Sequence, residues 1–257
     1  MRYGVIADVH GNADALKVVL AELRRQGVDE FLVAGDLVGY GPHPNQCVED
    51  VAALGGYCVA GNHDLIALGE LSDDRCIRIA RESLRWTSEV LSDDARAFLH
   101  ALPRRTTAPG GVVLAHGTLE DAQKYTPDVR AAAPQLKRLR EEAGDEALLV
   151  LGHTHRPLAI GFRHGRLRGG GTVPLPANEP VIVNPGAVGQ SRELRARARC
   201  AVLDVARREV TFLALPYDIE SCRAALRQVG LSSEGCHLPP SLAAGARRFL
   251  RRARVRH

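Results

Sequence analysis

The sequence predicts an α/β protein in which a parallel sheet comes first and antiparallel strands follow. Two patterns carry this prediction. Short apolar runs alternate with helical periods over the first sixty residues, and after His155 short strand-like runs are separated by glycine or arginine turns. In addition, 45% of the 257 residues are hydrophobic, which is enough to form a core.

The first sixty residues alternate between strand and helix. Apolar runs at 2–8, 30–35 and 57–60 are typical of buried strands. Between them, residues 12–26 have apolar side chains at helical spacing with Gly27 just beyond, and residues 44–54 form a second helical segment. Strands that alternate with helices in this way form a parallel sheet with right-handed crossovers.

The middle and late parts of the chain add further elements. A helical region is expected over 75–100 with a restart cap at Ser92, and a helix at 135–142 separates strands at 112–115 and 147–151. Antiparallel strands are expected after His155, and a helix follows that is capped by Asp218 and ended by Gly230. These antiparallel strands are expected at 158–162, 166–168, 181–183, 200–205 and 210–215.

The net charge of +4 is unevenly distributed along the chain. Residues 221–257 contain eight arginines and one glutamate, which gives +7, so residues 1–220 sum to −3. We therefore expect a nearly neutral domain over 1–220 and a helical, arginine-rich extension over 221–257. A phosphate-binding surface spread over the whole body is not supported.

Several classes of protein are excluded. No uncharged stretch is longer than residues 106–119, whereas a transmembrane helix needs about twenty mostly apolar residues. Asp8 and His10 interrupt the first apolar run before a signal core could form, so we expect a cytoplasmic location and no membrane association. None of the six cysteines forms a C-x-x-C pair, and small buried thiols are the favoured interpretation.

Five short polar motifs each follow an apolar run directly. The carboxyl ends of parallel strands lie along one edge of a sheet, so side chains from separate motifs can meet in one crevice. Residues two apart in an extended segment also point to the same side. The motifs are Asp8-Val9-His10, Gly35-Asp36, Gly61-Asn62-His63-Asp64, His116-Gly117 and Gly152-His153-Thr154-His155.

These residue types point to a metal site. Carboxylate oxygen and imidazole nitrogen are ligands for divalent transition metals, and there are too many of them for one ion. Two ions that share one carboxylate would use them all. The absence of cysteine from the set favours an open catalytic site over a closed structural zinc site. Any one motif alone is weak and could be a turn or cap, but five in this order are specific.

The series D-x-H, G-D, G-N-H-[DE], H, G-H-x-H resembles the calcineurin-like metallophosphoesterase superfamily over residues 1–219. The segments 36–42 (DLVGYGP) and 184–189 (NPGAVG) look like its small bacterial and archaeal phosphodiesterase-type branch. The resemblance implies a four-layer α/β/β/α sandwich of two mixed sheets, with the first mostly parallel and the second more antiparallel.

The resemblance also implies the role of each motif residue. One metal would be held by Asp8, His10, Asp36 and His155, and the second by Asn62, His116 and His153 together with Asp36 as the bridge. His63 would be the catalytic imidazole, oriented by Asp64 or by a backbone carbonyl. Two divalent ions per chain are expected; family members often use Mn²⁺, while Fe, Co, Ni or Zn also suit the ligands.

The implied reaction is hydrolysis of a phosphodiester or phosphomonoester. A hydroxide that bridges the two metals would attack phosphorus, and His63 would protonate the leaving group as general acid. The partner expected from this is a small phosphate ester. Three weaker candidates for substrate contact are Asn12, which could equally cap a helix, His43 in a Gly/Pro loop, and Arg156, which could equally form a salt bridge. Loops 37–46, 64–76 and 118–130 are expected to set specificity.

Other functions remain open at this point. The G-D motif continues without the arginine of protein Ser/Thr phosphatases, and Asp64 stands where their motif has Glu. The segment His10-Gly11-Asn12 nevertheless resembles those enzymes and dinucleoside polyphosphate hydrolases. A catalytically inactive protein-binding scaffold is an alternative of another class, although such scaffolds typically lose ligands that this chain keeps. The arginines at 247–256 leave nucleic-acid binding as a further, less favoured reading. The oligomeric state is not predicted.

Overall fold

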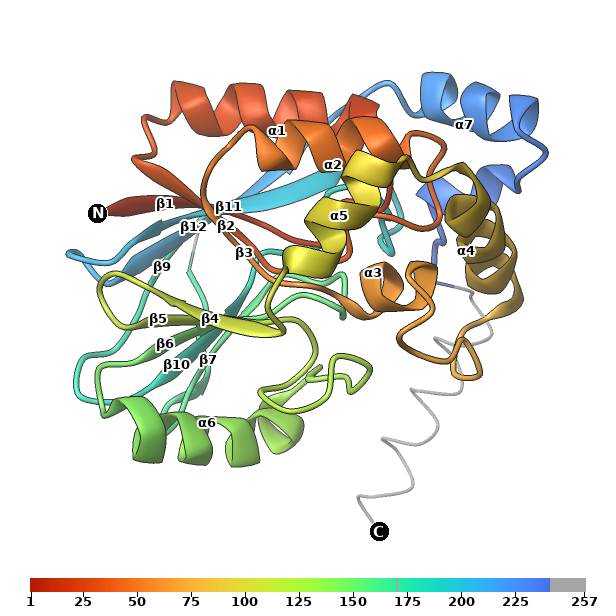
Figure 1. Cartoon of the computed structure of the whole chain (residues 1–257). Coiled ribbons are helices and arrows are strands. Elements are labelled where there is room, and N and C mark those ends of the chain that lie inside the picture. Colours follow the sequence, from red (N-terminus) through yellow and green to blue (C-terminus); the bar gives the residue numbers. More distant parts are fainter. Residues whose placement is uncertain (170, 241–257) are drawn as a thin grey trace, which may run out of the picture.

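The computed structural model describes residues 1–169 and 171–240 and shows two facing β-sheets between layers of helices (Figure 1). Helices α1 (Ala13–Arg25) and α2 (Pro44–Ala52) cover the outer face of one sheet, and α6 (Val129–Ala143) covers the outer face of the other. The predicted four-layer α/β/β/α sandwich of two mixed sheets is confirmed.

The first sheet has the strand order β3-β2-β1-β11-β12-β9. Its strands β1 (Arg2–Ile6), β2 (Glu30–Val33) and β3 (Tyr57–Cys58) run parallel, as the first sixty residues predicted. The remaining strands are antiparallel to their neighbours; they are β11 (Ala198–Asp204), β12 (Glu209–Leu215) and β9 (Thr172–Pro174).

The second sheet has the order β4-β5-β6-β10-β7-β8. Its two central pairings, which join β5, β6 and β10, are parallel, and the pairings outside them are antiparallel. The strands are β4 (Arg105–Ala108), β5 (Val112–Ala115), β6 (Leu148–Val150), β7 (Leu158–Gly161), β8 (Gly165–Arg166) and β10 (Val181–Asn184).

Alternation along the strands divides the core into layers. Val5 points into the apolar layer between the two sheets, while the next residue, Ile6, packs under the helices of the first sheet. In the second sheet, Leu148 joins the layer between the sheets and Leu149 packs against α6. The two sheets are therefore held in fixed relation by a shared apolar layer, which also fixes the distance between their strand ends.

Two expectations about the sheets are wrong. The late strands do not build the second sheet alone, because β9, β11 and β12 extend the first sheet and β10 pairs in parallel with β6. Each sheet thus has two parallel and three antiparallel pairings, not a mostly parallel and a more antiparallel one. The short turns after His155 indicated local hairpins correctly, but they could not show which sheet each hairpin joins.

Local expectations differ in detail. Ser92 caps α5 (Asp93–Ala101) as predicted, after α4 (Arg78–Val90). Helix α6 begins six residues earlier than expected, capped by Asp128, and accommodates Pro134 in its second turn. The strands β4 and β9 and the short helix α3 (Asn62–Ala67) were not predicted. All six cysteines are free, as expected, and four of them are buried.

The C-terminal segment packs on the body of the protein. Helix α7 (Ile219–Gln228) is capped by Asp218 and followed by Gly230, as predicted, and a 3-10 turn (Ser233–Cys236) comes next. Cys222, Leu226 and Cys236 form a small buried cluster there. The arginine-rich stretch at 247–256 lies outside the described residues, and the domain boundary at residue 220 stays a prediction.

Candidate metal centre

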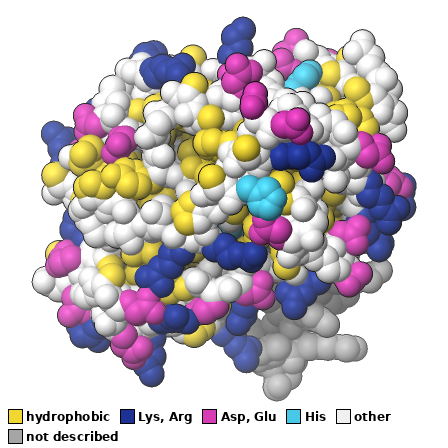
Figure 2. Space-filling view, in the orientation of Figure 1, with side chains coloured by type: hydrophobic (Ala, Val, Ile, Leu, Met, Phe, Trp, Pro, Cys, Tyr) yellow, Lys and Arg dark blue, Asp and Glu magenta, His cyan; other side chains and the backbone are white. Residues whose placement is uncertain are grey.

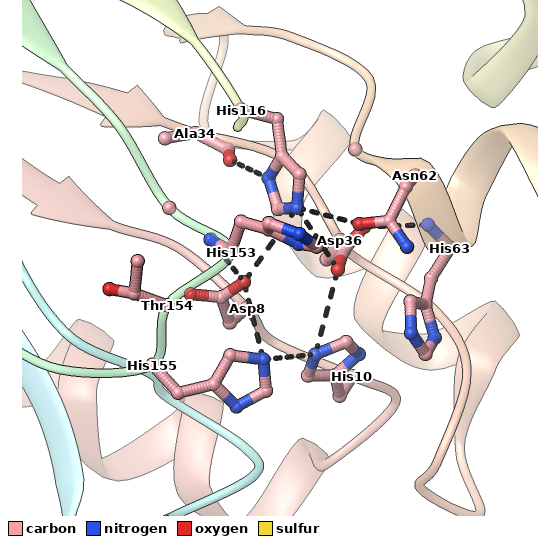
Figure 3. A network of polar contacts seen from close by, with 12 residues as sticks. Asp8, His10, Ala34, Asp36, Asn62, His63, His116, His153, Thr154 and His155 are labelled. Carbon is pink, nitrogen blue, oxygen red and sulfur yellow. Dashed lines mark hydrogen bonds and ion pairs between the residues drawn. The ribbon is translucent and has the colours of Figure 1, made fainter. Parts of the chain in front are cut away.

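The predicted ligands lie together at the carboxyl ends of the strands (Figure 3). Asp8 and His10 follow β1, and Asp36 follows β2. The remaining ligands come from the first turn of α3 and from the ends of β5 and β6; they are Asn62, His116, His153 and His155. All seven side chains are buried. The convergence expected from the parallel strands is therefore confirmed.

The backbone at these residues is not extended. Asp8, His10, Asp36, His153 and His155 all have left-handed φ values, between 49° and 63°. Both members of each D-x-H and H-x-H pair therefore reach the centre through left-handed turns, so the expected strand alternation is the wrong reason for their shared direction. Such non-glycine conformations are costly and cluster at functional sites, where the surrounding structure holds them.

Hydrogen bonds between the loops hold this backbone. The Asp8 amide donates to the carbonyl of Gly35 (3.0 Å) and the His10 amide to that of Asp36 (2.9 Å). Glycine is required at Gly61, because a Cβ there would overlap the Asp36 carboxylate. The loops after β1, β2 and β3 thus pack backbone against backbone, which fixes their side chains.

Three imidazoles are oriented by backbone carbonyls. Nδ1 of His10 is 3.0 Å from the carbonyl of Val38, and Nδ1 of His155 is 2.8 Å from that of Gln190. His116 makes the same contact with Ala34 (2.6 Å). A carbonyl only accepts, so each Nδ1 carries the hydrogen and donates it. Each Nε2 is left to face the centre, the usual arrangement of a histidine metal ligand.

Asp36 lies between two groups of ligands. Its Oδ2 is 3.1 Å from Nε2 of His116 and 3.7 Å from Nε2 of His10. On one side, Asp8, His10 and His155 could share an ion, and on the other, Asp36, His116 and His153 could share one; His10, Asp36 and His63 also lie close enough to share one. Asn62 adds its Oδ1 to the second group, 3.1 Å from Nε2 of His116.

The residues fit divalent ions. Nε2 of His10 and Nε2 of His155 lie 3.1 Å apart with both hydrogens on the opposite nitrogens, so two lone pairs face each other. A metal with bonds of about 2.1 Å holds neighbouring ligands about 3 Å apart at a right angle, which matches this spacing. Oδ2 of Asp8, Oδ2 of Asp36 and Nε2 of His153 are also buried without a hydrogen-bond partner. Buried polar atoms left unpaired in this way are costly, and bound cations would satisfy them.

Burial keeps most of these rings neutral. It lowers the pKa of His10 and His155 well below the usual value and that of His153 to about 3, so each offers a lone pair. Burial alone would also lower the pKa of His116, but the adjacent Asp36 carboxylate raises it to about 9. In the absence of metal, a proton on His116 therefore supplies part of the positive charge that Asp36 requires.

Comparison with known proteins gives the family. The family described as calcineurin-like phosphoesterase matches residues 1–177, more than half of the chain. The chain belongs to the calcineurin-like phosphoesterase family. It is accordingly a metal-dependent phosphoester hydrolase, and its His/Asp cluster is where the divalent ions of the family would bind.

Individual relatives agree with this placement. A crystal structure of a metallophosphoesterase from Sphaerobacter thermophilus is 33% identical, covers 92% of this chain and 97% of its own, and superposes with a TM-score of 0.79. A hypothetical protein from Pyrococcus horikoshii has the same fold, with a TM-score of 0.73, 18% identity, and coverage of 91% of this chain and 96% of its own. An uncharacterized protein from Methanocaldococcus jannaschii is 29% identical over 226 residues, which are 84% of this chain and 88% of the relative.

The His63 ring lies beside the ligands of this phosphoesterase, and the His63 amide donates to Oδ1 of Asp36 (2.8 Å). The ring stacks on Tyr40, with centroids 4.8 Å apart, and in Figure 3 the dashed contact of His63 reaches its backbone nitrogen and not its ring. Its Nδ1 is buried without a partner. Gly39 has a φ of 80°, and a side chain there would collide with the His63 ring. Burial lowers the pKa of His63 to about 4, so the ring is neutral at pH 7 when no anion is bound.

The expectation that Asp64 or a backbone carbonyl orients the His63 ring is wrong for the described residues. Asp64 Oδ2 accepts from the amides of Asp36 (2.9 Å) and Gly61 (2.8 Å). Its Oδ1 accepts from the amides of Leu37 (2.8 Å) and Val38 (3.1 Å). All four donors are backbone groups of the ligand loops, so both carboxylate oxygens of Asp64 hold the loop that carries Asp36. A catalytic role for Asp64 stays a prediction.

A cavity of about 250 Å³ opens over the metal ligands. Arg192 was missed by sequence reasoning, whereas Tyr125, whose ring stacks on His153 at 4.0 Å, belongs to the expected loop 118–130. Arg192 stands among several arginines at 192–199, a pattern typical of an exposed segment. Its place three residues after the segment 184–189 was the available signal that it could lie near the site. The lining residues that matter here are Asp36, His63, Arg75, Tyr125, Arg192 and Leu238.

The three weaker substrate candidates lie elsewhere. Asn12 caps α1 through Oδ1 (3.1 Å to the Ala15 amide) and donates to the Gly189 carbonyl (2.9 Å), so its cap reading is confirmed and its side chain is fully used. His43 precedes α2 and does not line the cavity, and Arg156 is exposed outside it. The expected loops contribute to the wall, since residues 40, 75, 76, 123 and 125 line it. Among the residues that the structure describes, no helix is long and apolar enough to cross a membrane.

Proposed function

We propose that this protein hydrolyses a phosphodiester or phosphomonoester of a small molecule in the cytoplasm, using two divalent ions, with Mn²⁺ as the native metal. The observation that carries the proposal is the pair of ligand groups that meet at Asp36 on the floor of the cavity. Neither group alone uses all the inward-facing donors, and a carboxylate between them can serve both.

Hydrogen bonds and burial hold the proposed metal ligands of this chain in fixed positions. When bound, two divalent ions would activate a water as nucleophile and offset the negative charge of the phosphoryl group. The carbonyls behind His10, His116 and His155 hold their imidazoles in one tautomer, and burial keeps competing water out. The ligands are therefore arranged before substrate arrives, so little reorganisation is needed in the reaction.

His63 is the group we propose as general acid. Its ring lines the cavity and stacks on Tyr40, but its Nδ1 has no hydrogen-bond partner and can contact the leaving oxygen. The neutral ring must first take up a proton, and an anionic ester bound beside it favours the protonated form. Proton donation of this kind contributes about 10²–10⁴ in rate.

The surface does not favour nucleic acid as the substrate. On the face in Figure 2, Lys and Arg side chains are interspersed with Asp and Glu, and no continuous basic stripe is seen there. A small phosphate ester could bind within the cavity alone and would not require a basic surface outside it.

The test is hydrolysis of bis-p-nitrophenyl phosphate and p-nitrophenyl phosphate by the chelated protein, before and after addition of Mn²⁺. We expect activity that returns with Mn²⁺ and is lost in Asp36→Asn, while His100→Ala, an exposed histidine outside the site, serves as the control. No metal-dependent turnover of either ester would favour the non-catalytic scaffold.

A further inference from the structure

Arg192 is a cation inside the cavity without a carboxylate partner. Its Nε donates to Oε1 of Gln190 (3.1 Å), and its Nη2 lies 3.5 Å from Nε2 of His155. The adjacent Glu193 is paired with Arg199 instead, at 2.7 Å. Within residues 1–169 and 171–240, no carboxylate forms an ion pair with Arg192.

This arrangement is unfavourable unless an anion completes it. A partly buried guanidinium loses hydration, and the Asp8 carboxylate, although its charge acts on Arg192, forms no ion pair with it. Two divalent ions beside His155 would add repulsion. The guanidinium nevertheless faces the same cavity as Asp36 and His63, and the Tyr125 phenol lies beside it. In the described part of the chain, the Arg192 guanidinium therefore faces the cavity without a direct carboxylate partner.

We propose that Arg192 binds a non-bridging oxygen of the substrate phosphoryl group in this cavity. This inference deepens the proposed function and rests on it. A guanidinium donates along two parallel N–H bonds to phosphate oxygens, so it can orient the group as well as attract it. With one N–H held by Gln190, the guanidinium is fixed before substrate binds.

The C-terminal segment holds the loop that carries Arg192. The Ser191 amide donates to the carbonyl of Cys236 (3.3 Å), and the Leu238 amide donates to the carbonyl of Ser191 (3.0 Å). Nε2 of His237 donates to the carbonyl of Glu193 (2.9 Å). Residues 236–238 therefore act as a positioning segment for Arg192, although they lie far from it in sequence.

The experiment compares Arg192→Gln and Arg192→Lys with Arg195→Gln, an exposed arginine on the same segment. Binding of inorganic phosphate to the Mn²⁺-loaded protein is measured by calorimetry, and KM and kcat are measured with p-nitrophenyl phosphate. We expect Arg192→Gln to weaken phosphate binding and raise KM by about 10- to 100-fold, the usual loss for hydrogen bonds to a charged group. Arg192→Lys keeps the charge and loses the two-pronged geometry, so a smaller loss is expected.

Metal content separates this role from a structural one. Arg192→Gln that keeps wild-type metal content while losing phosphate affinity supports the proposal. Arg192→Gln that binds phosphate as the wild type does, or that loses metal in parallel with phosphate, overturns it. If the wild type hydrolyses no ester with Mn²⁺, the proposed function fails, and phosphate calorimetry still decides whether Arg192 is an anion ligand.

Discussion

Asp64→Asn should destabilise the protein strongly, although the substitution replaces only one carboxylate oxygen with an NH₂ group. Each carboxylate oxygen of Asp64 accepts two backbone amides. An asparagine keeps one accepting oxygen and turns an NH₂ group toward the other two donors. Two buried N–H groups are then left unpaired, at about 1–3 kcal/mol each.

The expected loss is therefore about 2–6 kcal/mol, a large part of the roughly 5–15 kcal/mol by which a typical domain is stable. For a chain of this size, about 2–4 °C of melting temperature corresponds to each kcal/mol. Urea unfolding of the metal-free protein, followed by circular dichroism, measures the loss directly. Asp74→Asn, an exposed acid in a neighbouring loop, is the matched control.

The competing interpretation makes a different forecast. If Asp64 acted by orienting His63, Asp64→Asn would have normal stability and would reproduce the kinetic defect of His63→Ala. Normal unfolding of Asp64→Asn together with a selective loss of activity would refute the positioning role. A less stable protein with reduced metal affinity is the expected result, because the Asp36 loop in its left-handed conformation is no longer held.

Three further predictions concern the metal centre. His63→Ala should lower turnover of alkyl phosphate esters far more than of nitrophenyl esters, because a nitrophenolate leaves without a proton; equal losses would remove His63 from the acid role. Asp36→Asn should hold fewer than two ions per chain by metal analysis, and two retained ions would disprove bridging. The His116 pKa of about 9 means that this ring is protonated at pH 7 and must release its proton to become a ligand. Metal affinity should therefore rise with pH toward about 9, and calorimetry in buffers of different ionisation heat should detect proton release; binding with no released proton would contradict this.

The fold and the metal ligands were largely predictable because their signals are local. Apolar runs mark the central strands, and each ligand motif directly follows one, so the order of motifs was readable before their geometry was known. For Arg192 the only local signal was its place three residues after the segment 184–189, which does not show that its side chain faces the cavity. Its place depends on hydrogen bonds to residues 236–238, which are long-range contacts.

The short helix α3 was missed for a related reason. Asn62, His63 and Asp64 were interpreted by their chemistry, as parts of a polar motif after a strand, and no helix was assigned to them. The helix begins there because Asp64 accepts the Gly61 amide and the His63 amide donates to Oδ1 of Asp36 (2.8 Å). Helix formation at this position follows from the packing of the loops more than from helix propensity.

The C-terminal segment raises two separate questions: which of its residues hold the Arg192 loop, and what its basic residues do. The excess of +7 after residue 220 suggested one basic extension, yet residues up to 238 contain only two of its eight arginines and hold the Arg192 loop.

A deletion of 231–257 would remove both the positioning segment and the basic stretch, so lost activity could not be assigned to either one. Deletion of 241–257 removes six arginines and keeps the residues that make the hydrogen bonds between 236–238 and the Arg192 loop. If the arginines recruit nucleic acid, this shorter deletion should abolish salt-sensitive binding of an oligonucleotide and leave turnover of p-nitrophenyl phosphate unchanged. Reduced turnover of the small ester would instead assign the arginines to the catalytic site.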